Sequence, residues 1–143
     1  MRLKIKRLQS AVGLPEPATA GAAGFDLAAA ADIEVPPRSI RLVGTGLVIG
    51  VPAGYFLGIF ARSSTPLKKG LMVANGVGII DSDYCGPADE VKIQVLNITD
   101  APVKVARGDR LAQGIVLPYP RVEWDEVDEM AVPTRGGFGS TGV

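Results

Sequence analysis

Hydrophobic residues recur at every second position in several short stretches of the chain, as in a β-strand that buries one face. The clearest stretch holds Val91, Ile93 and Val95, which alternate with largely polar residues. Residues 1–8 and 103–105 repeat the pattern. We therefore expect short strands with one buried face in all three places.

Three other stretches are more continuously apolar, namely residues 41–51, 55–60 and 111–117. This pattern is typical of strands covered on both faces or packed at a subunit interface. Eighteen glycines and eleven prolines divide the chain into short pieces between these stretches. The sequence therefore predicts an all-β fold.

One segment has the signals of a helix. Ser64 or Thr65 is suited to cap it, and Pro66 is suited to its first position. Residues 67–69 favour helix, and Gly70 is suited to end it. We expect one or two helical turns here.

The length of 143 residues fits a single domain with a real hydrophobic core. We expect residues 1–132 to form this β-rich core domain. Residues 133–143 contain four glycines and one large apolar residue, and no strand follows them. We therefore expect them to form a flexible arm.

No apolar stretch approaches the ~18 residues of a membrane span. The basic N-terminus alternates charged and apolar residues, unlike a secretory signal. Cys85 is the single cysteine, so nothing in the sequence indicates an oxidising compartment. We expect a cytoplasmic protein with no membrane association.

Fifteen basic residues balance fifteen acidic ones, which argues against non-specific binding to a nucleic-acid polymer. Any nucleotide would have to be held by a local site. The absence of histidine excludes Ser-His and Cys-His nucleophilic pairs and His-containing zinc sites. Acid-base chemistry in this protein therefore needs a carboxylate.

Two early segments carry polar groups that suit an anion. Asp26 lies among small and apolar residues, and on its own it is more typical of a turn than of a site. Arg62, Ser63 and Ser64 precede the expected helix and combine a guanidinium, hydroxyls and free N–H groups. They predict a phosphate site, although a simple serine cap remains an alternative.

The third segment spans residues 75–86. Glycine-permitted bends on both sides of an apolar pair predict a tight hairpin whose tip admits a flat base, with Asn75 beside it. Asp81 follows the pair, and a partly shielded carboxylate there can take a proton from water. Tyr84 offers a ring for a sugar. A plain turn with solvated aspartates remains the alternative.

The last two segments are a turn with its following strand and a tail. We expect residues 107–110 to form a β-turn in which Asp109 and Arg110 pair, and Gln113 to lie at the edge of the core or to bind phosphate. In the tail, residues 135–142, glycines and hydroxyls suit phosphate oxygens, and Phe138 suits stacking on a base.

Taken in order, these five segments resemble the five motifs of the trimeric dUTPase family. The resemblance implies a jelly-roll-like (β-clip) fold, assembled as a homotrimer in which the subunits share three active sites. It implies Mg²⁺-dependent hydrolysis of dUTP to dUMP and pyrophosphate. That reaction would limit uracil incorporation into DNA and supply dUMP for thymidylate synthesis.

The resemblance also implies residue roles at the base and sugar. Asp81 would be the general base that activates the attacking water. Tyr84 would lie beneath the deoxyribose, with Lys92 near the sugar and phosphates. The uracil would contact Asn75 and the backbone of Gly78, Ile79, Ile80 and Asp81.

At the phosphates the resemblance implies contacts from Arg62, Ser63, Ser64 and Gln113. Ser63 and Gln113 would take part in catalysis with Asp81, and Asp26 would hold Mg²⁺ through water. The arm would close over the site of another subunit. Its contacts would come from Arg135, Phe138, Gly139, Ser140 and Thr141.

Two further functions remain open from the sequence. Ser64 stands where dUTPases usually have glycine, and an Arg-Ser-Ser sequence is more typical of dCTP deaminases, which favours a deaminase or a bifunctional enzyme as an alternative. A regulatory protein that binds the nucleotide without catalysis is the other. Asp83, Tyr84 and the intact tail favour dUTP over dCTP, and the presence of both Asp81 and Gln113 favours catalysis over regulation.

Overall fold

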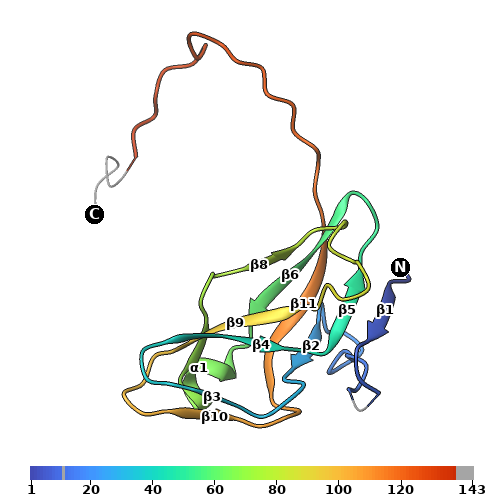
Figure 1. The fold of residues 1–143 in the computed structure, drawn as a ribbon. Helices are drawn as coiled ribbons and strands as arrows, with labels where there is room; N and C mark the ends of the chain where they lie inside the picture. The colour runs from blue at the N-terminus through green and yellow to red at the C-terminus, as the bar shows by residue number, and fades with distance from the viewer. Residues whose placement is uncertain (11, 138–143) are drawn as a thin grey trace.

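The computed structural model describes residues 1–10 and 12–137, and its regular secondary structure consists of antiparallel strands and one short helix (Figure 1). This confirms the predicted all-β class with one short helix. The helix is α1 (Ser64–Lys69). The strands are β1 (Lys4–Arg7), β2 (Phe25–Ala28), β3 (Ile33–Val35), β4 (Ile40–Gly44), β5 (Leu47–Gly50), β6 (Tyr55–Ala61), β7 (Leu71–Val73), β8 (Gly78–Ile80), β9 (Lys92–Asn97), β10 (Val103–Val105) and β11 (Arg110–Pro118).

The strands form two larger sheets and two paired ribbons. The four-stranded sheet has the order β2-β11-β6-β8, and the three-stranded sheet has the order β4-β9-β7. β1 pairs with β5, and β10 pairs with β3. Strands distant in the sequence therefore lie side by side, and β11, the last strand, lies in the interior of its sheet.

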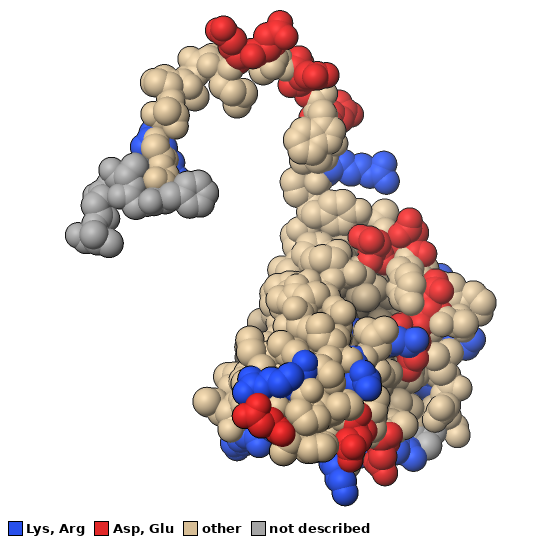
Figure 2. Space-filling view, turned by 60° about the vertical axis from the view of Figure 1, so that its left-hand side comes forward, with Lys and Arg blue, Asp and Glu red and all other residues tan. Residues whose placement is uncertain are grey.

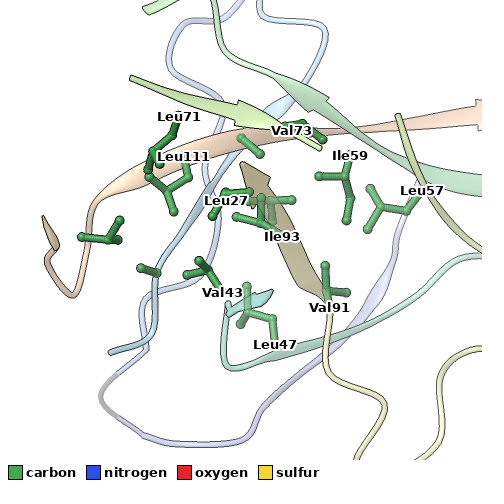
Figure 3. Packing of buried hydrophobic residues seen from close by; sticks show 14 of the residues in the cluster. Leu27, Val43, Leu47, Leu57, Ile59, Leu71, Val73, Val91, Ile93 and Leu111 are labelled. Atoms are coloured by element: carbon green, nitrogen blue, oxygen red, sulfur yellow. The ribbon is translucent and has the colours of Figure 1, made fainter. Parts of the chain in front are cut away.

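The hydrophobic core lies between the two larger sheets (Figure 3). Leu57 and Leu111 come from the four-stranded sheet, and Val43 and Ile93 come from the three-stranded one. All four side chains are buried. The alternation of Val91, Ile93 and Val95 is confirmed, because these three side chains enter the core.

Residues 41–51 form two strands, β4 and β5, separated by a turn in which Gly46 has a positive φ of 67°. Two local expectations were wrong. The four residues of β1 are all exposed, so β1 buries neither face, and among the described strands it pairs with β5 alone. The helix begins at Ser64 after Ser63, whose side chain makes no capping hydrogen bond, so Pro66 is not its first residue. Gly70 ends it in the left-handed conformation, as expected.

The chain leaves the body of the protein after β11, and residues 119–137 are exposed (Figures 1 and 2). Acidic side chains gather on the first part of this segment. The division at residue 132 stays a prediction, but the packed strands end earlier, at Pro118. Among the described residues, no helix has the length and apolar character needed to cross a membrane.

Asn97 is a fully buried polar side chain that joins three segments. Its Nδ2 donates to the carbonyl oxygens of Val35, Pro36 and Ala101, at 2.8 to 3.1 Å. Its Oδ1 accepts from the N–H and the hydroxyl of Thr99, both at 2.8 Å. The end of β9 is thereby fastened to the end of β3 and to the following turn.

We predict that Asn97→Ala lowers the free energy of unfolding by about 3 kcal/mol, because it leaves buried carbonyls and an N–H without partners. Denaturant unfolding at a fixed protein concentration measures this. Leu67→Ala is the control, since Leu67 is 89% exposed on α1 and its loss should cost no more than about 0.5 kcal/mol. Equal losses in both variants would contradict the role of Asn97.

Candidate active site

The register of β11 brings residues from separate sequence segments onto one face of the four-stranded sheet. Gln113 pairs with Asp26 of β2 on one side and with Phe60 of β6 on the other. Residues paired directly across antiparallel strands point to the same face. The first, second and fourth predicted segments therefore meet in one place.

A β-bulge in β11 adds Arg110 to this face. Arg110 pairs with Ala28 and Ala112 pairs with Leu27, so Leu111 is an extra residue. Leu111 and Ala112 are both buried, although consecutive strand residues normally point to opposite faces. The bulge shifts the alternation by one residue, which turns the side chain of Arg110 toward Asp26.

Asp26 lies between two guanidinium groups. Its Oδ1 is 2.7 Å from Nε of Arg62, and its Oδ2 is 2.9 Å from a terminal nitrogen of Arg110. Arg62 also donates to the carbonyl oxygen of Arg110, at 3.1 Å. Two cations against one carboxylate leave this cluster with a net positive charge, which suits a polyanion.

The start of α1 is fastened to the start of β11. The buried hydroxyl of Thr65 donates to the carbonyl oxygen of Leu111, at 3.0 Å. Lys69 Nζ lies 2.6 Å from Asp109 Oδ2, which also accepts from the N–H of Ala106, at 2.9 Å. The expected pairing of Asp109 with Arg110 is wrong, because each finds a partner on another segment.

Ser63, Ser64 and Gln113 lie around this cluster. Ser63 is exposed, and Ser64 is partly buried at the first position of α1. Gln113 Nε2 donates to the carbonyl oxygen of Ala61, at 3.0 Å, and so lies beside the chain that leads to Arg62. The two serines therefore directly follow Arg62 in the chain, and the amide of Gln113 contacts the residue that precedes it.

The third segment lies on the far side of β6. Asn75 is exposed in the turn between β7 and β8, and its Nδ2 lies near Gly78. The predicted hairpin pairing is wrong, because β7 pairs with β9 whereas β8 pairs with β6. The two strands that flank the turn thus belong to different sheets.

Asp81 is not brought to the arginine cluster. It follows β8, whose last residue Ile80 pairs with Leu57, so Asp81 lies beside Phe56. Gln113 pairs with Phe60, four residues further along β6, a separation of about 13 Å along the strand. Asp81 is also exposed, so the described chain does not supply the shielding that we expected.

Tyr84 and Lys92 lie near each other through Glu90. The hydroxyl of Tyr84 is 3.5 Å from the carbonyl oxygen of Glu90, and Lys92 Nζ is 3.9 Å from the Glu90 carboxylate. Both side chains are exposed to a large extent. Arg135 is exposed in the extended segment after β11, and Phe138, Gly139, Ser140 and Thr141 lie outside the described residues.

Comparison with known proteins identifies this arrangement. The family model for dUTPase matches residues 11–142. The deoxyuridine 5′-triphosphate nucleotidohydrolase of Hydrogenobaculum sp. is 42% identical to this chain, and the match covers all of this chain and 99% of that protein. The enzyme of the same name from Helicobacter pylori (strain P12) is 37% identical, and the match covers all of this chain and 98% of that protein. The chain belongs to the dUTPase family.

Solved dUTPase structures have the same fold. The Streptococcus mutans dUTPase is 36% identical and superposes with a TM-score of 0.79, over 85% of this chain and 98% of that one. The dUTPase of Staphylococcus bacteriophage 80alpha has a TM-score of 0.88 at 23% identity and covers 99% of both chains. The chain is a dUTP diphosphatase that hydrolyses dUTP, so the enzyme class predicted first from the sequence is confirmed.

Arg110 is the residue of this candidate site that the sequence did not indicate. It belongs to the turn expected over residues 107–110, and regular alternation from Leu111 onward would direct residue 110 away from Gln113. The adjacent apolar pair Leu111 and Ala112 is the one signal of the bulge. A cavity of about 490 Å³ adjoins the site and is lined by Asp26, Arg110 and residues 12–18, among others.

The side chains of this dUTPase fit a metal ion that binds together with the nucleotide. The family uses Mg-bound nucleotide. Among the described residues, no group of three or more His, Cys, Asp or Glu side chains is able to hold an ion. Asp26 already binds two arginines, so an ion there would take its remaining ligands from phosphates and water, as Mg²⁺ commonly does.

The ion pair between Lys69 and Asp109 makes part of the folding stability depend on pH. Hydrogen bonding to Lys69 is the main reason that the pKa of Asp109 is lowered. A lowered pKa in the folded state stabilises the fold above the unfolded value of about 4, and this contribution is lost as the pH falls through the lowered pKa.

We therefore predict that Asp109→Asn lowers Tm at neutral pH, and that the difference from wild type shrinks below about pH 4. Thermal melts of both proteins between neutral and acidic pH measure it. Asp100→Asn is the control, because Asp100 pairs with Arg38 on an exposed surface and its loss should change Tm little. A difference that grows on acidification would contradict the assignment.

Proposed function

We propose that the enzyme hydrolyses dUTP in sites shared between the subunits of a homotrimer. The observation that carries this proposal is the separation of Asp81 from the arginine cluster along β6. A carboxylate must be within hydrogen-bond reach of the water that it activates. Within one chain Asp81 is too far from phosphates bound at Arg62, so the Asp81 of one subunit serves the cluster of its neighbour.

The exposed apolar residues support association. Ile40, Leu42 and Met72 lie exposed on the three-stranded sheet, where Ile40 and Met72 flank Leu96 in the register. A row of apolar side chains on one sheet face is typical of an interface. A closed homotrimer would cover it.

The extended segment supports an exchange of arms. Trp124 is 92% exposed, and Val122, Met130 and Val132 are also exposed. Such side chains gain stability only when another surface covers them. We infer that residues 119–137 cross a neighbouring subunit and carry the arm, residues 133–143, to its site. There Arg135, Ser140 and Thr141 would bind phosphate and Phe138 would stack on uracil.

Arg62, Ser63, Ser64 and Gln113 would bind the triphosphate, and we add Arg110 to this set. A phosphate that enters between Arg62 and Arg110 forms charge-assisted hydrogen bonds in place of part of the Asp26 contact. Asp26 holds both guanidinium groups in orientation. It would contact Mg²⁺ through water, and the ion when bound would neutralise phosphate charge.

The base and sugar would lie along the third segment. Asn75 and the backbone of residues 78–81 present hydrogen-bonding groups for uracil, and β8 has one edge unpaired among the described strands. Tyr84, which is 43% exposed, has a free ring face for the deoxyribose. Lys92 lies near enough to this ring to reach the sugar end of the phosphates.

The reaction is then a single displacement at the α-phosphorus. Asp81 accepts a proton from water, and the water oxygen forms a bond to that phosphorus. The bond from phosphorus to the oxygen that bridges to the β-phosphate breaks, and pyrophosphate leaves. Ser63 donates to this bridging oxygen, and Gln113 orients the α-phosphate. The products are dUMP and pyrophosphate.

The cellular role follows from these products. Removal of dUTP limits uracil in DNA, and the dUMP formed supplies thymidylate synthesis. Both processes suit a cytoplasmic location, with which a single free cysteine is compatible.

We predict that Asp81→Asn lowers kcat for dUTP by at least about 100-fold and leaves binding of a non-hydrolysable dUTP analogue within a few-fold. Pyrophosphate release and calorimetric titration measure the two quantities. Asp83→Asn is the matched control, because it changes a neighbouring exposed carboxylate and should keep turnover. Undiminished turnover by Asp81→Asn would overturn the assignment of the base.

The shared site makes a second prediction. Arg62→Ala and Asp81→Asn should each be inactive when assayed alone. When the two variants are refolded together, the mixed trimers should recover up to about one quarter of wild-type activity. This recovery is expected because each site takes Arg62 from one subunit and Asp81 from another. Sedimentation should give the mass of a trimer. No recovery in mixed trimers would show that Arg62 and Asp81 of the same chain serve one site.

A further inference from the structure

Glu90 closes the loop that follows Tyr84. The loop is compact, because the N–H of Gly86 donates to Asp89 Oδ2, at 2.7 Å, and the N–H of Asp89 donates to the carbonyl oxygen of Gly86, at 3.2 Å. Lys6 of β1 donates to the carbonyl oxygen of Pro87, at 2.7 Å. The loop is thus an ordered connection between Tyr84 and β9.

The carboxylate of Glu90 holds the end of this loop against another part of the chain. Its Oε1 accepts from the N–H of Gly46, at 2.7 Å, in the turn between β4 and β5. The next residue, Val91, exchanges backbone hydrogen bonds with the same turn, through Thr45 and Leu47. The side chain of Glu90 is only 21% exposed, so this contact is well shielded from solvent.

Gly44 provides the space for this carboxylate. A Cβ added at Gly44 would lie 2.5 Å from Oε1 of Glu90, closer than atoms approach one another. Gly44 does not have a positive φ, so its backbone does not require glycine. The three nearest atoms to this position all belong to the carboxylate of Glu90, so a side chain at residue 44 would displace that carboxylate.

The main chain of Glu90 faces Tyr84. The carbonyl oxygen of Glu90 is 3.5 Å from the hydroxyl of Tyr84, which is a long hydrogen bond. Among the described residues, this is the one side-chain hydrogen bond of Tyr84. The carbonyl oxygen that the Tyr84 hydroxyl faces is thus placed by the loop end that the carboxylate of Glu90 anchors.

We propose that Glu90 is a positioning residue for sugar specificity, which holds the Tyr84 ring where it excludes a 2′-hydroxyl. This rests on the proposed role of Tyr84. A ring that is free to move by a small distance leaves room for the hydroxyl of a ribonucleotide. Loss of the anchor should therefore change the choice between dUTP and UTP more than it changes the chemical step.

The test compares kcat/KM for dUTP and UTP in a set of full-length variants. Glu90→Ala should lower the ratio of the two values by about tenfold, the effect of losing one charged hydrogen bond. Glu90→Gln keeps an acceptor for the N–H of Gly46 and should keep the ratio within about twofold. Glu34→Ala is the control, since Glu34 is an exposed glutamate on β3, and it should leave the ratio unchanged.

Gly44→Ala tests the same anchor without changing Glu90. The added Cβ must displace the carboxylate, so the ratio should fall as in Glu90→Ala. This second variant decides the matter if Glu90→Ala does not fold. An unchanged ratio in a folded Glu90→Ala or Gly44→Ala protein would overturn the proposal, as would an equal loss in Glu90→Gln.

Tyr84 variants separate this inference from the proposed function. Tyr84→Phe removes the hydroxyl that faces Glu90, so adding Glu90→Ala to it should lower the ratio by less than Glu90→Ala does alone. Fully additive losses would contradict the proposal. Tyr84→Ala should lower the ratio on its own. If Tyr84→Ala leaves the ratio unchanged, the proposed role of Tyr84 fails as well. If the ratio falls in Tyr84→Ala but not in Glu90→Ala, only the inference about Glu90 is wrong.

Discussion

The pairing of β11 between β2 and β6 is the constraint on which the active site depends. Its hydrogen-bond ladders set Gln113 opposite Asp26 on one side and Phe60 on the other. A slip by one residue would turn Gln113 into the core and Ala112 outward. The buried residues of β11 prevent that slip, so the packing of the core also determines the geometry of the phosphate end.

Because of the bulge at Leu111, β11 contributes both to the core and to the candidate site. Leu111 and Ala112 are both buried in the core, and the shifted alternation directs Arg110 to Asp26. Thr65 and Lys69 then fasten α1 to the start of β11, which holds Arg62 beside the same carboxylate. Stability and function therefore share contacts here: the residues that join α1 to β11 also set the spacing of the two arginines.

A different constraint governs the segment proposed to bind the base and sugar. There the turn after β7, the short strand β8 and the loop to β9 lie along the opposite edge of the sheet, with their polar side chains exposed. The two groups of candidate site residues thus lie at separate places on one chain. If the proposed trimer forms, activity depends on assembly, and the exposed apolar residues of the sheet face and of the segment after β11 would be covered by neighbouring subunits.

The sequence by itself determined the all-β class, the alternating strand at Val91 to Val95, the single helical turn that Gly70 ends, and the residue types of the five motifs. These depend on local periodicity and backbone preferences, which each short segment carries within itself. The sequence did not reveal the bulge, the partners of Asp109 and Arg110, the placement of β7 and β8 in different sheets, or the exposure of Asp81. Only the tertiary structure decided these, because hydrogen-bond register and ion pairing are settled between segments that lie far apart in the chain and compete for the same partners.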